Sequence, residues 1–137
     1  MPSILENLRK NRANSATYDE VLQAIDEFSK EVEQFASELG GKVICIRESG
    51  FAVDYGQEWR VALYKGLPIG GGKVMDYSQI LFRVYVPLTP FRPEPVRCDF
   101  NEEELSVCSS LEELKWELER FAGLPHVAET IQYLSTK

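Results

Sequence analysis

The fold is decided by the stretch 17-TYDEVLQAIDEFSKEVEQFASELGG-41, in which large apolar residues recur at steps of three and four. This spacing places the apolar residues along one side of an α-helix and leaves the acidic side chains on the opposite side. Thr17 with Glu20 is a typical start signal, and Gly40 with Gly41 is a typical stop signal. A helix of about six turns with one apolar stripe needs a large apolar surface to pack against.

From residue 42 the spacing of apolar residues changes from helical to alternating, which is typical of β-strands. A continuous apolar segment covers 43–46, and alternating segments follow at 51–55, 58–64, 79–86, 96–100 and 105–107. In the first alternating segment Phe51, Val53 and Tyr55 form the apolar side. Short connections favour an antiparallel meander. We therefore predict an α+β fold with a meander sheet of about five to six strands and the long helix on one face.

The two ends of the chain add further helices. Ser110 with Glu113 predicts the start of a helix that ends at Gly123, and Pro125 predicts the start of a last helix. At the other end, residues 1–16 are expected to form an arm or a short helix with Ile4, Leu5 and Leu8 on one side. The polar segment 11–15 is expected to link this arm to a single domain over 17–137.

Composition and charge exclude several classes of protein. The chain has 137 residues with 44% hydrophobic and 27% charged residues, which is typical of a globular domain. The net charge is −7, with −4 over 1–41, +3 over 42–97 and −6 over 98–137. This acidity argues against non-specific nucleic-acid binding, which requires cations to neutralise phosphates. No apolar stretch is long enough for a membrane span, and the first residues do not resemble a secretory signal.

Cysteine and histidine are few. The three cysteines, Cys45, Cys98 and Cys108, lie in or beside apolar segments without CxxC spacing, so we expect them to be reduced, as in a cytoplasmic protein. With His126 as the single histidine, the residue types for a zinc or iron site are scarce. We predict no metal site, no cofactor and no catalytic residue.

The glycine-rich segment Gly70-Gly71-Gly72-Lys73 invites comparison with a phosphate-binding loop. That loop needs Gly at its first position and Ser or Thr after the lysine, whereas Leu67 and Val74 occupy these positions here. A strand rather than a helix is expected to follow, so no helix N-terminus would face a phosphate. The segment is therefore expected to be a hairpin loop, or a loop that orders on a partner.

The outward sides of two strands carry an unusual composition. If 58–64 and 79–86 form an antiparallel hairpin, one face presents Arg60, Tyr64, Leu81, Arg83 and Tyr85, and residues of these types are enriched at protein interfaces. The alternative is that the C-terminal helices cover this face and its arginines reach out to acidic side chains. Trp116 falls outside the apolar stripe of its helix and is a further contact candidate, as is the arm.

Three functions are compatible with these features. The first is a non-enzymatic protein-interaction module, an adaptor, chaperone-like or regulatory protein that binds a protein partner or forms a homodimer through the sheet face. The second is a small-molecule binder or enzyme with an anionic ligand near Arg60 and Arg83, which would require a concave pocket there. The third is an acidic inhibitor, such as an immunity protein, of a basic partner.

Overall fold

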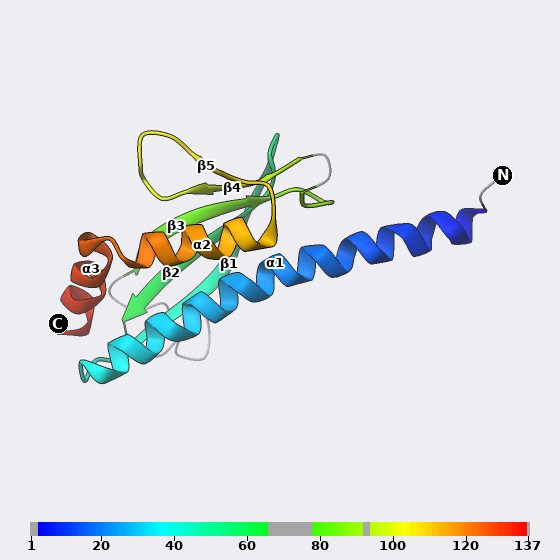
Figure 1. The fold of residues 1–137 in the computed structure, drawn as a ribbon. Coiled ribbons are helices and arrows are strands. Elements are labelled where there is room, and N and C mark those ends of the chain that lie inside the picture. Colours follow the sequence, from blue (N-terminus) through cyan, green and yellow to red (C-terminus); the bar gives the residue numbers. More distant parts are fainter. Residues whose placement is uncertain (1–2, 66–77, 92–93, 137) are drawn as a thin grey trace.

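A five-stranded antiparallel sheet and three helices make up the fold (Figure 1). The computed structural model describes residues 3–65, 78–91 and 94–136. The elements run in the order α1 (Ile4–Glu38), β1 (Val43–Val53), β2 (Gly56–Lys65), β3 (Ser78–Val86), β4 (Val96–Asp99), β5 (Ser106–Cys108), α2 (Leu111–Ala122) and α3 (Pro125–Ser135). The strands lie side by side in sequence order, which confirms the predicted meander.

The helix α1 is longer than predicted. It runs without interruption through residues 11–15, where an irregular link was expected, and the predicted start at Thr17 lies inside it. Ser3 caps its first turn because its Oγ accepts a hydrogen bond from the Glu6 backbone N–H at 3.2 Å. No Gly or Pro separates this cap from the packed half of the helix, so the costly nucleation step is needed only once. The helix ends as predicted, before Gly40, whose φ is +81°.

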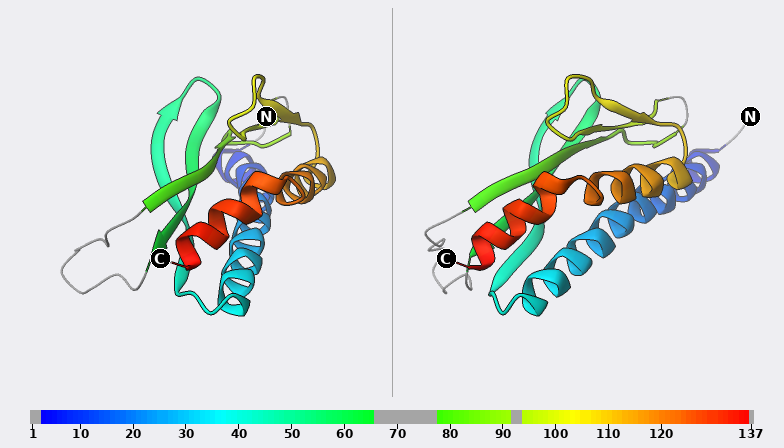
Figure 2. Two further views of the ribbon diagram at one scale, coloured as in Figure 1. Left: turned by 90° about the vertical axis from the view of Figure 1, so that its left-hand side faces the viewer. Right: turned by 60° about the vertical axis from the view of Figure 1, so that its left-hand side comes forward.

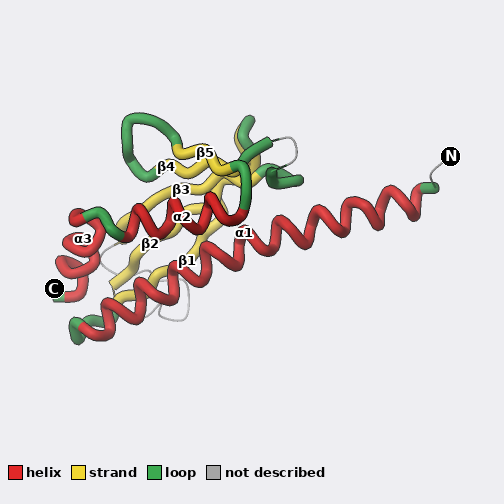
Figure 3. Tube along the Cα trace, in the orientation of Figure 1, coloured by secondary structure: helices red, strands yellow, loops and turns green. Residues whose placement is uncertain are grey.

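All three helices lie on one side of the sheet (Figure 2, left). Phe82 of β3 contacts Phe28 of α1 and Phe121 of α2, with ring centroids 5.3 and 5.1 Å apart. Phe121 also stacks on Phe100 at 4.7 Å. The helix α3 adds Val127, Ile131 and Leu134 to the same cluster of buried residues. The core is thus a single layer of side chains between the sheet and the helices, which Figure 3 shows as yellow and red layers.

Polar contacts tie α1 to the first two strands. Arg47 of β1 binds the Asp26 carboxylate through two hydrogen bonds of 2.8 and 3.1 Å. The same guanidinium lies 4.4 Å from the ring centre of Trp59, and the Trp59 indole N–H donates to the Tyr18 hydroxyl at 2.9 Å. These contacts hold the middle of α1 against the sheet.

The three cysteines are buried and unpaired. Cys45 of β1 packs under α1, and burial raises the pKa of its thiol to about 12. Cys98 and Cys108 lie on neighbouring strands, where their mutual hydrogen bond and their burial raise the pKa of Cys98 well above its ordinary value. Thiols held in the neutral form in this way are poor nucleophiles. Within the described residues, no helix is both long enough and apolar enough to cross a bilayer.

Candidate functional site

The face of the sheet that points away from the helices is the candidate site, and we call it the open face. Strand pairing places Arg60 between Glu48 and Arg83, and Arg83 opposite Asp99, in one row across four strands. Among the paired strand residues that the structure describes, the open face includes Ile44, Ile46 and Glu48 of β1, Glu58, Arg60, Ala62 and Tyr64 of β2, Ile80, Arg83 and Tyr85 of β3, Arg97 and Asp99 of β4, and Val107 of β5.

No helix of the described chain covers the open face (Figure 2). The sequence allowed two arrangements of the C-terminal helices. They could cover this face, or they could lie elsewhere. The buried residues of α2 and α3 pack against α1 and the opposite side of the sheet. The arginines and tyrosines of the open face are therefore accessible from solvent, although each is partly buried by its neighbours.

A buried carboxylate, that of Glu58, holds two arginines of the open face. Glu58 is only 8% exposed, and its Oε1 lies 2.5 Å from Arg60 Nε and 3.9 Å from Arg83 Nε. The hydrogen bond from Arg60 to Glu58 raises the pKa of that guanidinium above its ordinary value. Gly50 of β1 makes room for the carboxylate, because a Cβ at this position would overlap the Glu58 side chain.

A second carboxylate fixes a tyrosine at the edge of the same face. The Tyr64 hydroxyl donates a hydrogen bond to Glu48 Oε1. This bond, followed by burial, raises the pKa of Tyr64 to about 12. Tyr85 also has a raised pKa, mainly because it is partly removed from water. Both phenols therefore stay neutral across the physiological pH range and can act as hydrogen-bond donors.

Aromatic and cationic side chains stack at the end of the open face near the β1–β2 turn. The rings of Tyr55 and Tyr85 meet edge to face with centroids 5.7 Å apart. The Arg97 guanidinium lies 4.8 Å from the centre of the Tyr55 ring, and the Arg60 guanidinium lies 5.9 Å from that of Phe51. Phe51 itself is 76% exposed. These contacts limit the freedom of long side chains that would otherwise move in water.

Phe51 and Tyr55 were not predicted as members of this surface, although both are exposed. Phe51 lies at a β-bulge between Ser49 and Ala52, where the register shifts, and Tyr55 lies in the turn that follows β1. The signal was Gly50, because a glycine inside a strand often marks a bulge that redirects its neighbours.

The other predicted site residues lie in different places. Leu81 lies at a second bulge, where the β2–β3 register shifts, and is 5% exposed within the hydrophobic core. Trp116 is 61% exposed but lies on α2, on the helix side of the sheet. The loop residues Gly70, Gly71, Gly72 and Lys73 lie outside the described residues. Four of the predicted contact residues, Arg60, Tyr64, Arg83 and Tyr85, share the open face.

The arginines of the open face are accompanied by carboxylates of the same chain. Five grooves of about 210–450 Å³ are formed by described residues, and none of these five is lined by Arg60 or Arg83. Three acidic residues, Glu48, Glu58 and Asp99, stand among three arginines, so the face has no net charge. An anionic ligand would have to displace Glu58 from Arg60 before it could bind there.

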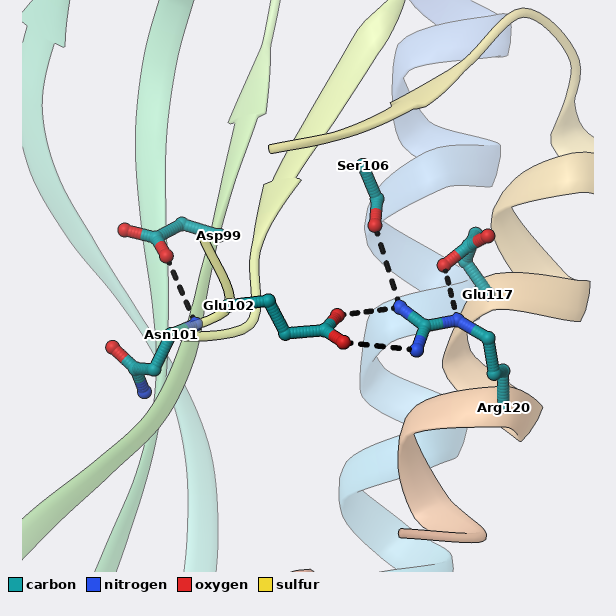
Figure 4. A network of polar contacts seen from close by, with 6 residues as sticks. All are labelled: Asp99, Asn101, Glu102, Ser106, Glu117 and Arg120. Carbon is teal, nitrogen blue, oxygen red and sulfur yellow. Dashed lines mark hydrogen bonds and ion pairs between the residues drawn. The ribbon is translucent and has the colours of Figure 1, made fainter. Parts of the chain in front are cut away.

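A second polar cluster lies between α2 and the β4–β5 connection (Figure 4). Arg120 of α2 binds both oxygens of Glu102 at 2.6 and 3.2 Å, and its Nε donates to Glu117 at 2.8 Å. Ser106 Oγ accepts a further bond of 3.4 Å. The hydrogen bond from Arg120 lowers the pKa of Glu102. Because these bonds join α2 to the segment that carries Glu102 and Ser106, we assign the cluster to holding the connection against α2.

Acidic residues gather at 102–104 and at 112–113. Within the described part of the chain, no group of three or more His, Cys, Asp or Glu side chains is placed to hold a metal ion. Glu113 instead caps α2, because its carboxylate accepts from the Ser109 N–H at 2.5 Å while its own N–H donates to Ser110 Oγ at 3.1 Å. No protein-family model, curated protein or solved structure matches the chain.

Proposed function

We propose that this chain is a protein-interaction module that docks a protein partner flat against the open face. The proposal rests on one observation. The described helices leave one face of the sheet uncovered, and this face carries arginine, tyrosine and phenylalanine side chains. Exposed sheet faces usually carry Lys, Glu and Thr, whereas Arg, Tyr and Phe are enriched where proteins bind one another.

The ordering of these side chains supports a role in binding. Binding normally costs about 0.5–1.5 kcal/mol for each long side chain that becomes fixed. Arg60 is already held by Glu58, and Arg97 already stacks on Tyr55. Part of this entropy is therefore lost on folding rather than on binding, which favours association with a partner of complementary shape.

The size of the open face indicates the strength of the contact. Strands of 11, 10, 9, 4 and 3 residues, at about 3.3 Å per residue and about 4.8 Å between strands, give a face of about 600 Å². A stable complex buries about 800 Å² on each partner. Phe51 and Tyr55 enlarge the surface at one end, but we still expect a reversible complex rather than a permanent one.

The geometry supports a protein over a small anionic ligand. The guanidinium of Arg60 is neutralised by a carboxylate of the same chain, and no described groove among the five reaches it. A partner protein can use the neutral phenols and stacked rings without displacing Glu58. The partner is either another protein or a second copy of this chain, and the experiment below separates the two.

The proposal is tested by photo-crosslinking in cells that produce the chain naturally. A photoreactive phenylalanine analogue replaces Phe51, which lies beside Arg60 at the open face, or Trp116, which lies on α2 on the helix side; both positions are exposed. We expect one discrete protein adduct from position 51, identified by mass spectrometry, that is lost when Arg97→Glu is added. An adduct with the chain itself would identify self-association through the open face.

Position 116 is the control that decides whether docking on the open face is rejected. The same adducts from positions 51 and 116, or none from position 51, would contradict docking on the open face. Circular dichroism of each variant confirms that the fold is retained, because Phe51 is mostly exposed and Arg97 lies at the surface of the sheet.

A further inference from the structure

The charged side chains at the centre of the open face form a symmetrical row. Four residues lie directly opposite one another on β1, β2, β3 and β4, in the order Glu48, Arg60, Arg83 and Asp99. Because neighbouring strands are about 4.8 Å apart, the row is roughly 14 Å long. Its charges run negative, positive, positive and negative. The row therefore has a cationic centre and anionic ends.

The centre of the row stays cationic at the surface, although a carboxylate lies beside it. Glu58 is 8% exposed, whereas about a third of each arginine side chain is exposed. An approaching surface therefore meets the guanidinium groups of Arg60 and Arg83 before it meets the carboxylate. One carboxylate beside two guanidinium groups also leaves an excess of positive charge at this point.

Arg83 makes no hydrogen bond to any residue that the structure describes. The carboxylate oxygen that lies within 4 Å of it is Glu58 Oε1, and its distance of 3.9 Å from Arg83 Nε is too long for a hydrogen bond. Asp99, on the neighbouring strand, accepts from the Asn101 backbone N–H at 3.0 Å instead (Figure 4). Arg83 therefore presents its hydrogen-bond donors to solvent.

Tyr85 is a second donor on the same face. It follows Arg83 by two residues on β3, so the two side chains project from the same side about 7 Å apart. Its ring contacts Tyr55, but its hydroxyl makes no hydrogen bond within the described chain. A carboxylate has two acceptor oxygens, and charge-assisted hydrogen bonds to it are strong. An acidic side chain of a partner, placed between Arg83 and Tyr85, can accept from both.

A second copy of the chain is a poor partner for this row. Two identical faces that dock against each other are related by a two-fold axis in the plane between them. Whatever the direction of that axis, an axis through the centre of the row places Arg60 and Arg83 of one copy against the same arginines of the other. Like charges in contact oppose association. Self-docking centred on the row is therefore disfavoured.

A displaced axis removes this repulsion but reduces the contact. An axis between β1 and β2 places Glu48 of one copy against Arg60 of the other. Only these two strands then overlap, and strands of 11 and 10 residues give about 330 Å². A stable complex buries about 800 Å² on each partner. The charge pattern therefore favours a different protein over a second copy.

We propose that the partner of the open face is a different protein whose docking surface is acidic at its centre and basic at its margins, with a carboxylate that accepts hydrogen bonds from Arg83 and Tyr85. The inference rests on the proposed docking at the open face and adds the class of partner. Such a partner leaves the bond between Arg60 and Glu58 in place, because it uses the arginine that has no hydrogen bond of its own.

The test titrates the purified chain, with the photoreactive residue at position 51, into a lysate of the cells that produce it naturally. The chain concentration that gives half of the maximal adduct is the readout. Arg83→Gln is expected to raise this concentration by at least about tenfold, because one member of a charge pair is lost. Tyr85→Phe removes the hydroxyl and keeps the ring, and it is expected to raise the concentration by about two- to tenfold.

Salt dependence separates a charge pair from a merely structural role of Arg83. Raising the salt concentration from about 0.05 M to about 0.5 M is expected to weaken the adduct of the natural chain more than that of Arg83→Gln, because only the natural chain has the pair to screen. Lys115→Gln, at an exposed position of α2, is the matched control. It removes the same charge and is expected to leave the readout unchanged. Circular dichroism confirms that each variant is folded.

The outcomes separate this inference from the proposed function. An adduct with another protein that is equally strong in Arg83→Gln and Tyr85→Phe, or equally sensitive to salt with and without Arg83, would overturn the inference and leave docking on the open face intact. An adduct of the chain with itself would overturn it too, because the partner would be a second copy. No adduct from position 51 of the natural chain would instead overturn the proposed function, and this inference with it.

Discussion

At the scale of single residues, the open face depends on one carboxylate and one missing side chain. Glu58 is buried beneath the arginines of β2 and β3, and Gly50 leaves the space that it occupies. A buried carboxylate is tolerated only when charged partners surround it. Glu58 therefore holds Arg60 and Arg83 in place, although the sequence did not predict it as part of the site.

This arrangement predicts a coupling between Gly50 and Glu58. Gly50→Ala is expected to lower the free energy of unfolding by about 1–2 kcal/mol, because the new Cβ displaces the carboxylate from Arg60. In a Glu58→Ala background the same substitution is expected to cost less than about 0.5 kcal/mol. Urea denaturation of the four proteins in this double-mutant cycle measures the coupling, and additive effects would contradict it.

A second residue-scale prediction concerns Tyr64, whose pKa is about 12 because of its hydrogen bond to Glu48. Glu48→Gln is expected to lower this pKa towards the ordinary value of 10.0, since a neutral amide no longer opposes the phenolate. A raised folded-state pKa means that the associated stability is complete below pH 10 and is lost as the pH rises towards 12. Carbon-13 NMR of labelled tyrosine, assigned with Tyr64→Phe, follows the titration.

At the scale of elements, Arg120 fastens α2 to the connection between β4 and β5. It binds Glu102 with both terminal nitrogens and Glu117 with Nε (Figure 4). The Arg120 guanidinium also lies 5.6 Å from the centre of the Phe100 ring. Because β5 has only three residues, from Ser106 to Cys108, these side-chain contacts add to the buried apolar contacts, such as Phe100 on Phe121, that hold this edge of the sheet to the helix layer.

The ion pair between Arg120 and Glu102 predicts that the stability of the fold depends on pH. Arg120 lowers the pKa of Glu102 below its ordinary value of 4.5, so the stabilisation is present above that pH and is lost as the pH falls through the folded-state pKa. Both side chains are about one-third exposed, so Glu102→Gln is expected to cost only about 0.5–1 kcal/mol at pH 7. Urea midpoints of the variant and the natural protein should converge as the pH falls below the folded-state pKa of Glu102. Glu103→Gln is the matched control.

At the scale of the whole molecule, the sheet separates two surfaces with different composition. One side carries the helices and the core, and the other carries the arginines and tyrosines of the open face. The first third of α1 extends beyond both (Figure 1).

The same geometry predicts two levels of hydrogen exchange along α1. Amides at 21–36 pack on the sheet and should exchange slowly at every concentration, because opening them requires global unfolding. Amides at 7–16 should exchange much faster, because the core contacts of α1 begin only at Val21. Mass spectrometry of exchanged peptides measures both segments, and equal protection of 7–16 and 21–36 would contradict this difference.

The sequence by itself determined the parts of the fold that depend on neighbours along the chain. The apolar spacing at 17–39 fixed the packed half of α1, the alternation from residue 43 fixed the strands, and Ser110 and Pro125 fixed the starts of α2 and α3. Short connections fixed the meander order. Each of these features is governed by interactions over a few residues, so a single sequence is enough to predict them.

Only the tertiary structure decided which residues form the candidate site. Alternation cannot reveal a bulge, and the two bulges in β1–β2 and β2–β3 moved Phe51 to the surface and left Leu81 in the core. Nor could an apolar stripe on α2 or α3 indicate which face of the sheet it would cover, because both faces offer apolar positions. That choice depends on how Phe28, Phe82 and Phe121 fit together across the core, and such a fit exists only once distant segments have met.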